Sequence, residues 1–270
     1  MKRGTKEKDA GARRVRAEGE RAASAVFAAV LLAALIVTVC GAVARDGNRA
    51  FTGALAAALL FLPFGLEKAC RLRFPCALRV SAYLFVLASQ ILGEACGFYR
   101  RFAFWDLLLH AESGFLLAAF GFGLFAGSAE NGGERYGSPS FPRAFSALCF
   151  SVTVGALWEL FEFAADRFLH TDMQKDARVW ALRSVALGEN GKIARVEDIV
   201  STTIWTANGA SFSFPGYLDI GLADTMGDLL AGLCGALIFC AIGYRYLKRR
   251  RGRLAAWLIP AGAKKREPPS

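Results

Sequence analysis

Long apolar runs, separated by short polar segments, dominate the pattern of this chain. A helix of about 20 apolar residues crosses the hydrocarbon core of a bilayer. Six runs approach or exceed that length, at about residues 22–44, 50–66, 77–97, 103–127, 143–166 and 218–244. The pattern therefore predicts an all-α fold class: a polytopic membrane helix bundle with six transmembrane helices.

The first apolar run has an alternative interpretation as a cleaved signal peptide. At about 23 residues it is longer than the apolar core of such a peptide, and Ala42-Val43-Ala44 only weakly resembles a cleavage site. We therefore expect a retained membrane anchor. Pro63, near the end of the second run, does not cancel that span, because membrane helices tolerate proline.

One polar segment, residues 167–216, is much longer than the other connections. It contains Asn190-Gly191 and Asn208-Gly209, and each pair is flanked by β-branched and apolar residues. Asn-Gly between such residues is the strongest short signal for a β-hairpin. A connection of this length without structure of its own would be unusual in a compact protein. We expect a small β-containing loop here.

The charge distribution predicts the orientation in the membrane. The formal net charge is +10, and the basic residues crowd the two ends of the chain. With six spans, 23 of the 33 basic residues fall on the side of the N terminus, and six of the other ten lie in the long loop, where charge counts for less. We expect a basic cytoplasmic tail at 1–21, a membrane domain at 22–247 with loop 167–216 outside, and a second cytoplasmic tail at 248–270.

The seven cysteines predict neither a disulfide framework nor a zinc site. They form no CxxC pair, and most lie in apolar runs. In that setting cysteine behaves as a small buried hydrophobic residue.

Ionisable residues inside the apolar runs are the strongest functional signal. Glu159, Glu162 and Asp166 recur at i, i+3 and i+7, which places them on one face of the fifth helix. A charge at the centre of a membrane helix costs about 2.5–3.5 kcal/mol on insertion scales. Three carboxylates in one stripe need partners, protons, water or a metal, unless this helix end simply reaches the wet interface.

Polar residues recur at the matching ends of the other spans. The third run ends with Gln90 and Glu94, the fourth opens with Asp106 and His110, and the sixth carries Asp224 and Asp228 early. In the orientation predicted above, all of these ends lie on the outer side of the membrane. We therefore expect one acidic cluster with a single imidazole near the outer leaflet.

Such a cluster suits two kinds of chemistry. Crowded carboxylates share protons or surround a cation, and carboxylates with one histidine suit Mg²⁺, Mn²⁺, Ca²⁺ or Zn²⁺ as well as general acid–base catalysis. The candidate catalytic or metal-binding residues are Asp106, His110, Glu159, Glu162, Asp224 and Asp228. The alternative for His110 is a core histidine bonded to Asp106.

A second group of residues could bind an anionic headgroup just outside the cluster. The candidates for substrate binding are Arg100, Arg101, Asp166 and Arg167. Guanidinium groups suit phosphate and carboxylate recognition. The alternative for the arginines is simple anchoring at the membrane interface.

Four motifs together resemble a known family. They are Trp105-Asp106-x-x-Leu109-His110-x-x-Ser113-Gly114, Trp158-Glu159-x-x-Glu162-x-x-x-Asp166, Asp172-Met173-Gln174-Lys175-Asp176, and Tyr217-Leu218-Asp219-Ile220-Gly221-x-x-Asp224-Thr225-Met226-x-Asp228-Leu229. Over residues 50–247 the chain resembles the YjdF-type family of bacterial inner-membrane proteins and, more distantly, VanZ-like proteins. Gly232 stands where that family usually has asparagine. The resemblance implies six spans, a bacterial inner-membrane location and a loose link to the cell envelope, without a reaction.

Several function classes lack their motifs in this sequence. His110-Ala111-Glu112-Ser113 is not HExxH, Glu112-Ser113-Gly114 is not GxSxG, and no Walker loop appears. No basic stripe with interleaved aromatic residues suggests nucleic acid. Three classes remain: an enzyme or binder for a lipid-linked envelope substrate, an ion- or proton-coupled transporter, and a structural or accessory protein stabilised by its acidic cluster. All three have membrane lipid as a partner, and the oligomeric state is open.

Overall fold

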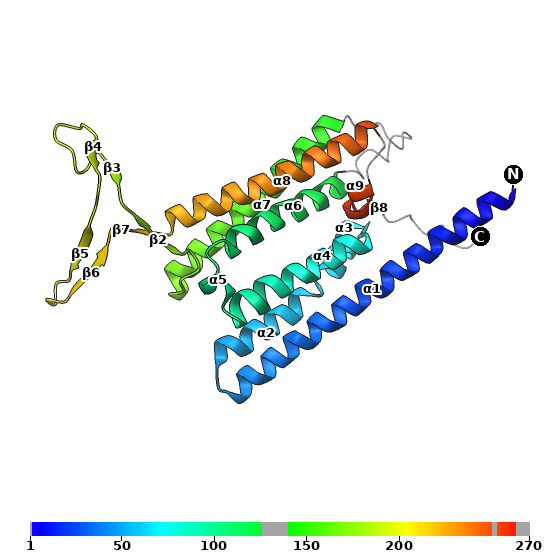
Figure 1. The fold of residues 1–270 in the computed structure, drawn as a ribbon, viewed down its shortest axis with the longest axis horizontal. Helices are drawn as coiled ribbons and strands as arrows, with labels where there is room; N and C mark the ends of the chain where they lie inside the picture. The colour runs from blue at the N-terminus through cyan, green and yellow to red at the C-terminus, as the bar shows by residue number, and fades with distance from the viewer. Residues whose placement is uncertain (1, 126–139, 250–252, 263–270) are drawn as a thin grey trace. The chain divides into compact units, whose positions relative to one another are not determined.

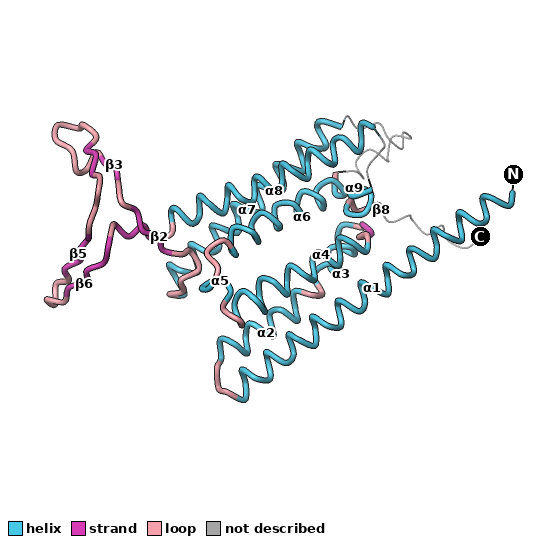
Figure 2. Tube along the Cα trace, viewed as in Figure 1, coloured by secondary structure: helices cyan, strands magenta, loops and turns pink. Residues whose placement is uncertain are grey.

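The structure is a computed structural model that describes residues 2–125, 140–249 and 253–262 (Figures 1 and 2). Helices dominate it. Their bounds are α1 Lys2–Val43, α2 Gly47–Leu59, α3 Leu62–Cys70, α4 Cys76–Val86, the π-helix η1 Leu87–Ala95, α5 Phe98–Arg101, α6 Trp105–Leu124, α7 Ser140–Leu169, α8 Leu222–Arg249 and α9 Arg253–Leu258.

The six predicted membrane spans are confirmed. Within the described residues, six helical segments are long and apolar enough to cross a bilayer: Arg14–Val43, Gly47–Cys70, Cys76–Ala95, Trp105–Leu124, Ser140–Leu169 and Leu222–Lys248. The protein is therefore a polytopic helical membrane protein. The first helix begins earlier than its apolar run, because the polar residues before Arg21 continue α1.

Two of the spans depart from a continuous α-helix. The second is divided into α2 and α3 at Leu60–Phe61, two residues before Pro63, whose missing N–H cannot continue the helical hydrogen bonds. The third changes from α4 into η1, where the Cys96 N–H bonds to the Ile91 carbonyl five residues back at 2.9 Å. A π-helix is uncommon and often marks functional sites.

The chain forms two compact units, and each is described here by itself. The first contains residues 1–155 and 231–270, and the second contains residues 156–230. The helices α7 and α8 each begin in one unit and end in the other.

The first unit contains two apolar clusters. In one, α1 and α2 pack against the third span through Val30, Ala34, Leu60 and Tyr83, which are all nearly fully buried. Gly53 lies directly against the backbone of α1 at Ala34, where a side chain would overlap it. The small residues therefore let α1 and α2 pack closely along their length (Figure 1).

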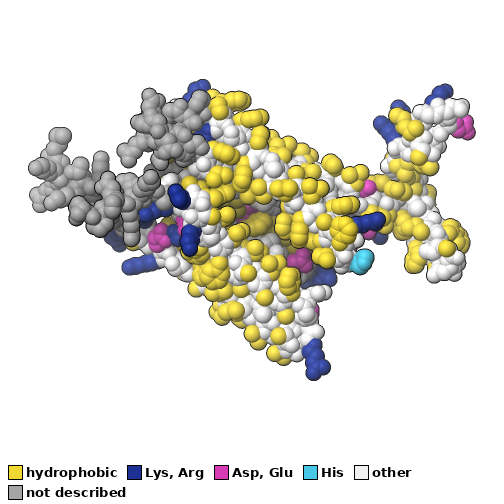
Figure 3. Space-filling model, turned by 180° about the vertical axis from the view of Figure 1, so that it is seen from behind, with side chains coloured by type: hydrophobic (Ala, Val, Ile, Leu, Met, Phe, Trp, Pro, Cys, Tyr) yellow, Lys and Arg dark blue, Asp and Glu magenta, His cyan; other side chains and the backbone are white. Residues whose placement is uncertain are grey.

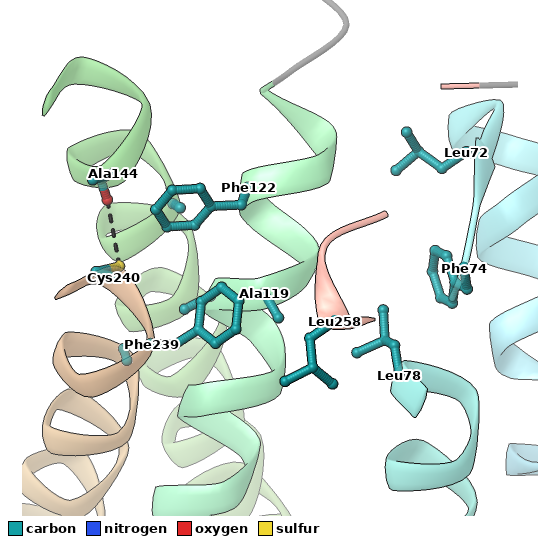
Figure 4. Packing of buried hydrophobic residues seen from close by; sticks show 12 residues of the cluster. Leu72, Phe74, Leu78, Ala119, Phe122, Ala144, Phe239, Cys240 and Leu258 are labelled. Atoms are coloured by element: carbon teal, nitrogen blue, oxygen red, sulfur yellow. Dashed lines mark hydrogen bonds between the residues drawn. The ribbon is translucent and has the colours of Figure 1, made fainter. Parts of the chain in front are cut away.

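The second cluster joins α4, α6 and α9 to the parts of α7 and α8 in this unit (Figure 4). The rings of Phe122 and Phe239 meet edge to face at 5.7 Å between centroids. The Cys240 thiol, also buried, donates a hydrogen bond to the Ala144 carbonyl at 3.4 Å. Cys240 thus serves as a small core residue, as its sequence context predicts, whereas Cys40, Cys96, Cys149 and Cys234 are exposed, so the prediction of buried cysteines is wrong for these four.

Glycines bring α6 and α8 into backbone contact in the same unit. A Cβ atom at Gly114 would overlap the Gly232 carbonyl, and one at Gly235 would overlap the Ala111 carbonyl. A Cβ atom at Gly232 would meet only the His110 carbonyl at 3.5 Å, an ordinary contact. The close approach of α6 and α8 therefore depends on Gly114 and Gly235 rather than on Gly232.

The end of the described chain folds back onto the helices. In α9, Ala255 and Leu258 are buried, and Leu258 belongs to the same cluster as Leu72 and Leu78. A short antiparallel pair, β1 Leu72–Arg73 with β8 Ala261–Gly262, completes the contact.

The helix surfaces carry many exposed large apolar residues, which Figure 3 shows in yellow. Leu32, Ile36 and Val39 on α1 are each more than half exposed. A water-soluble protein rarely leaves such a surface uncovered, and on membrane helices lipid covers it.

The second unit contains the long insertion between α7 and α8. Its strands are β2 Asp176–Val179, β3 Leu182–Ser184, β4 Ala194–Val196, β5 Ser201–Trp205, β6 Ser211–Pro215 and β7 Tyr217–Ile220. They form three antiparallel pairs, β2–β7, β3–β4 and β5–β6. The β2–β7 pair is a stalk from which the other two pairs leave as separate arms (Figure 2).

Both arms close over the predicted Asn-Gly pairs, so this sequence prediction is confirmed. At the end of the β3–β4 arm, Asn190 and Gly191 both have positive φ, as a type I′ turn requires. In the Asn208-Gly209 pair of the β5–β6 arm, only Gly209 has a positive φ, and its N–H donates a hydrogen bond to the Thr206 carbonyl at 3.0 Å. That arrangement matches a type I turn followed by a left-handed glycine.

Candidate functional site

Four carboxylates gather on the parts of α7 and α8 that belong to the second unit. Glu159 and Glu162 lie on α7, and Asp224 and Asp228 lie on α8. Glu159, Glu162 and Asp228 are only 5%, 8% and 1% exposed. Asp224 and Asp228 are both close enough to Glu162 to repel it electrostatically. The two helices thus bring together four of the six residues predicted to bind a metal or catalyse.

Polar groups surround the two glutamates of this cluster, and one of them holds Glu162. The indole N–H of Trp158 donates a hydrogen bond to Glu162 at 2.7 Å, and the spacing i, i+4 makes that contact possible within one helix. Glu159 faces the Thr225 hydroxyl and Asp224 across the helix pair. A carboxylate that is held at a fixed position is a better ligand than a mobile one, because less freedom is lost on binding.

A short loop after α7 closes one end of the cluster. The Lys175 backbone N–H donates to Asp224 at 2.8 Å, and the Gln174 side-chain amide donates to the Thr225 hydroxyl at 2.5 Å. Lys175 also lies close enough to Asp228 to act on its charge. The sequence pattern pointed to Asp172-Met173-Gln174-Lys175-Asp176 only through a family resemblance, and the structure gives two of these residues a physical role.

Asp166 organises the same loop from the end of α7. It accepts hydrogen bonds from the Thr171 hydroxyl and from the backbone N–H groups of Met173 and Gln174, all at 2.7–2.8 Å. These bonds orient both carboxylate oxygens toward the chain itself. The substrate-binding role expected for Asp166 stays a prediction, and the structure adds a role in shaping the loop.

The remaining two predicted ligands form a pair in the first unit. Asp106 and His110 are one turn apart on α6, and the His110 Nε2 lies 3.6 Å from the Asp106 carboxylate. Their side chains are 17% and 14% exposed. A carboxylate beside an imidazole orients the ring and fixes its tautomer, an arrangement that is common both in metal sites and in structural pairs.

The predicted arginines lie outside both groups. Arg100 and Arg101 are exposed on the short helix α5, and Arg167 is exposed near the end of α7. Glu94, at the end of η1, is exposed as well. A headgroup-binding role for the arginines stays a prediction.

Comparison with known proteins gives a family and little more. The model of the family described as "Predicted membrane protein (DUF2238)" matches residues 23–249. An "Uncharacterized protein" of Thermotoga maritima is 26% identical over 109 residues, which cover 40% of this chain and 54% of that protein. The chain thus matches about half the length of this curated relative. No solved structure matches.

Proposed function

Because the chain belongs to this family of predicted membrane proteins, DUF2238, we propose a function from its polar residues: it binds a divalent cation and uses it to act on a phosphate-bearing, lipid-linked substrate of the cell envelope. The ligands in this proposal are Asp106, His110, Glu159, Glu162, Asp224 and Asp228. The resemblance to YjdF-type and VanZ-like proteins supports a bacterial inner-membrane location.

The burial of three carboxylates within membrane spans carries the proposal. Glu159, Glu162 and Asp228 are each at least nine-tenths buried, and charged groups in such surroundings are costly unless they are paired, protonated or bound to a metal. A cation of charge two offsets this cost for several carboxylates at once. Oxygen ligands from carboxylates are those that Mg²⁺ and Ca²⁺ prefer, and an added imidazole suits Mn²⁺ or Zn²⁺.

Chain topology supports including the Asp106–His110 pair. Consecutive membrane spans run in opposite directions, so the start of α6, the end of α7 and the start of α8 face the same side of the membrane. Asp106 is the second residue of α6, Glu162 is in the last third of α7, and Asp224 is in the first turn of α8. The six residues would therefore lie at a similar depth.

A lipid-linked substrate follows from this depth. A cation near the membrane surface can bind phosphate oxygens of a headgroup whose lipid tail remains in the bilayer, and it stabilises charge that develops during phosphoryl chemistry. Arg100, Arg101 and Arg167 are candidates for further headgroup contacts because they are exposed near the ends of membrane helices.

An ion- or proton-coupled transporter is the second candidate, because buried carboxylates also suit proton transfer. A structural role, in which the cation only stabilises the helices, is the third. In a transporter we would expect ionisable residues along the whole depth of the spans, whereas Glu159, Glu162, Asp224 and Asp228 all lie toward one end of α7 and α8.

Cation binding by the purified full chain in nanodiscs tests the proposal. We expect a bound divalent metal after purification and saturable Mn²⁺ binding by electron paramagnetic resonance. Asp228→Asn and Glu162→Gln should each weaken this binding by about tenfold to a hundredfold or more, as the loss of metal-site partners does. Asp176→Asn, which removes a carboxylate from the same unit outside the spans, is the matched control.

The other candidate functions give different results in the same preparation. Proton flux in proteoliposomes without cation binding would favour the transporter. Cation binding that raises thermal stability, but leaves a panel of phosphate-bearing lipids unbound and unchanged, would favour the structural role. Equal Mn²⁺ affinity in the wild type, Asp228→Asn and Glu162→Gln would contradict the proposed site.

A further inference from the structure

Two arginines face each other on the β3–β4 arm of the insertion. The strand register pairs Arg183 directly with Arg195, and both side chains are exposed. Residues directly opposite in an antiparallel pair point to the same face, with Cβ atoms about 4.5–5.5 Å apart. The two guanidinium groups therefore present a concentrated positive charge on one face of the arm.

This arrangement is unfavourable without a partner, because like charges directly opposite in a β-ladder destabilise it. Within the described part of the chain, neither Arg183 nor Arg195 forms an ion pair or a side-chain hydrogen bond. An anion between the two guanidinium groups would remove the repulsion. Phosphate is well matched, since arginine binds phosphate oxygens through two parallel hydrogen bonds.

The end of the same arm is apolar and carries one charge of each sign. Between β3 and β4, Val185, Leu187 and Ile193 are 55%, 61% and 64% exposed, and Lys192 and Glu189 add one charge of each sign. Gly188 permits this compact end, because a Cβ atom there would overlap the Lys192 carbonyl. Exposed apolar side chains beside basic ones are typical of segments that enter the interface of an anionic membrane.

An open hollow of about 400 Å³ adjoins Arg183 and is lined by Ala181, Leu182, Arg183 and Glu197. The Glu197 carboxylate disfavours a bare phosphate there but would accept hydrogen bonds from headgroup hydroxyls. Phosphatidylglycerol carries both a phosphate and hydroxyl groups.

We propose that the β3–β4 arm docks on the anionic phospholipid surface of the bilayer that its own helices cross, with headgroup phosphates bound between Arg183 and Arg195. The insertion leaves α7 at Leu169 and enters α8 at Leu222, so this surface is always near it. Tethering of this kind raises the effective concentration of a weak ligand. The proposal is independent of the cation site.

The β5–β6 arm has a composition that fits the same surface. Residues 199–218 contain no charged side chain, and the arm exposes Trp205 and Phe212, which are 75% and 58% accessible. Tryptophan is enriched at membrane–water interfaces, where its ring is partly apolar and its N–H stays wet. The two arms would thus supply one electrostatic and one aromatic contact with the bilayer.

Hydrogen exchange of the full chain in nanodiscs tests the docking. Nanodiscs of phosphatidylcholine alone are compared with nanodiscs that also contain phosphatidylglycerol. We expect the amides of residues 182–196 to exchange more slowly in the anionic nanodiscs. Each arginine near an anionic surface contributes about a fivefold effect, so the Arg183→Gln/Arg195→Gln double variant should lose most of the difference. Arg178→Gln removes a positive charge from β2 instead, and this variant should keep the difference in exchange between the two lipid compositions.

Two further comparisons make the outcome of the experiment decisive. The Arg183→Lys/Arg195→Lys variant keeps both charges, so it should retain the lipid effect even if the glutamine variant fails to fold. Inorganic phosphate is added to the phosphatidylcholine nanodiscs and should not reproduce the protection. Equal exchange in the two lipid compositions or full protection by inorganic phosphate would each overturn docking on a lipid surface.

Discussion

The backbone N–H of Lys175 donates a hydrogen bond to the Asp224 carboxylate at 2.8 Å. This contact joins the loop that leaves α7 to the first turn of α8, although 49 residues separate the two positions. The acceptor belongs to the proposed cation site. Asp224 therefore couples the shape of the loop to the position of one proposed ligand.

Replacement of Asp224 should loosen this loop. A hydrogen bond to a charged acceptor contributes about 1.5–3 kcal/mol, so Asp224→Ala should speed hydrogen exchange of residues 171–176. Asp219→Ala is the matched control, because Asp219 accepts from the Ala223 N–H and caps α8 instead. Its effect should appear at the start of α8. Unchanged exchange at 171–176 in Asp224→Ala would show that the contact does not hold the loop.

The glycines between α6 and α8 should differ in their tolerance of alanine. At Gly235 the added Cβ atom overlaps the Ala111 carbonyl, and such overpacking typically costs about 1–3 kcal/mol. At Gly232 the new atom fits, and alanine is a better helix former by about 1 kcal/mol. Thermal unfolding in detergent should therefore show Gly235→Ala less stable than wild type, and Gly232→Ala equal or more stable. Gly232→Leu, a larger change, should destabilise the helix contact.

Neutral replacements in the proposed site should remove function without preventing membrane insertion. Asp106→Asn, Glu159→Gln and Asp228→Asn each remove a charge from a span, which eases insertion. We expect each to weaken Mn²⁺ binding by about tenfold to a hundredfold or more, and the Asp106→Asn/Asp228→Asn double variant to bind no worse than either single one, because residues that act as a unit fail together. Simple additivity of the two losses would place these residues in separate sites.

The orientation can be tested with reporter fusions after Arg45, Arg79, Arg101, Ser138, Asn190 and Arg253. The excess of basic residues at both ends predicts alternating signals that begin outside and finish inside. Ser138 lies outside the described residues, and its fusion tests the connection between α6 and α7. A cytoplasmic signal at Asn190 would put the insertion and the acidic cluster on the opposite side of the membrane.

The stalk of the insertion should weaken as the pH rises. Partial desolvation and the negative charges of Asp172 and Asp219 raise the pKa of Asp176, which opens β2. A carboxyl whose pKa is higher in the folded state than in the unfolded state favours folding in its protonated form. This stabilisation is complete below about pH 4, the ordinary pKa of aspartate, and disappears as the pH passes the raised value.

Protection factors of the β2–β7 amides, measured against pH, will show this effect. They should fall through the mildly acidic range in the wild type and stay level in Asp176→Asn, which cannot ionise. The Asp198→Asn variant, in the same insertion but outside the stalk, should retain the wild-type profile. A flat profile in the wild type would contradict the expected titration of Asp176.

The spans and the two arms could be predicted because their signals are local. The length of an apolar run is enough to predict a membrane helix. An Asn-Gly pair is enough to predict a turn, because both residues tolerate a positive φ, as Asn190-Gly191 shows. The pairing of Asp176 with Ile220 in the stalk joins residues far apart in the chain, and no local pattern encodes it. The π-helix of η1 has the same apolar composition as an α-helix, so the sequence pattern could not distinguish them.

The candidate site was predictable in part for a related reason. Glu159 and Glu162 stand out in the sequence because carboxylates are rare in membrane spans, and the structure places them with Asp224 and Asp228. The contributions of Gln174 and Thr225 were not predicted, because uncharged polar residues in a loop or at a helix end are common. Their role depends on the return of the chain to α8, which is a property of the tertiary structure.

The stalk also makes the insertion a modular unit. Asp176 and Ile220 are cross-strand partners, so the chain enters and leaves the insertion at nearly the same point. Evolution can lengthen, shorten or exchange the segment between them while the neighbouring helices keep their places, since such adjacent ends favour domain insertion. The same position would accept an engineered reporter domain, and homologues should differ in length chiefly between these two residues.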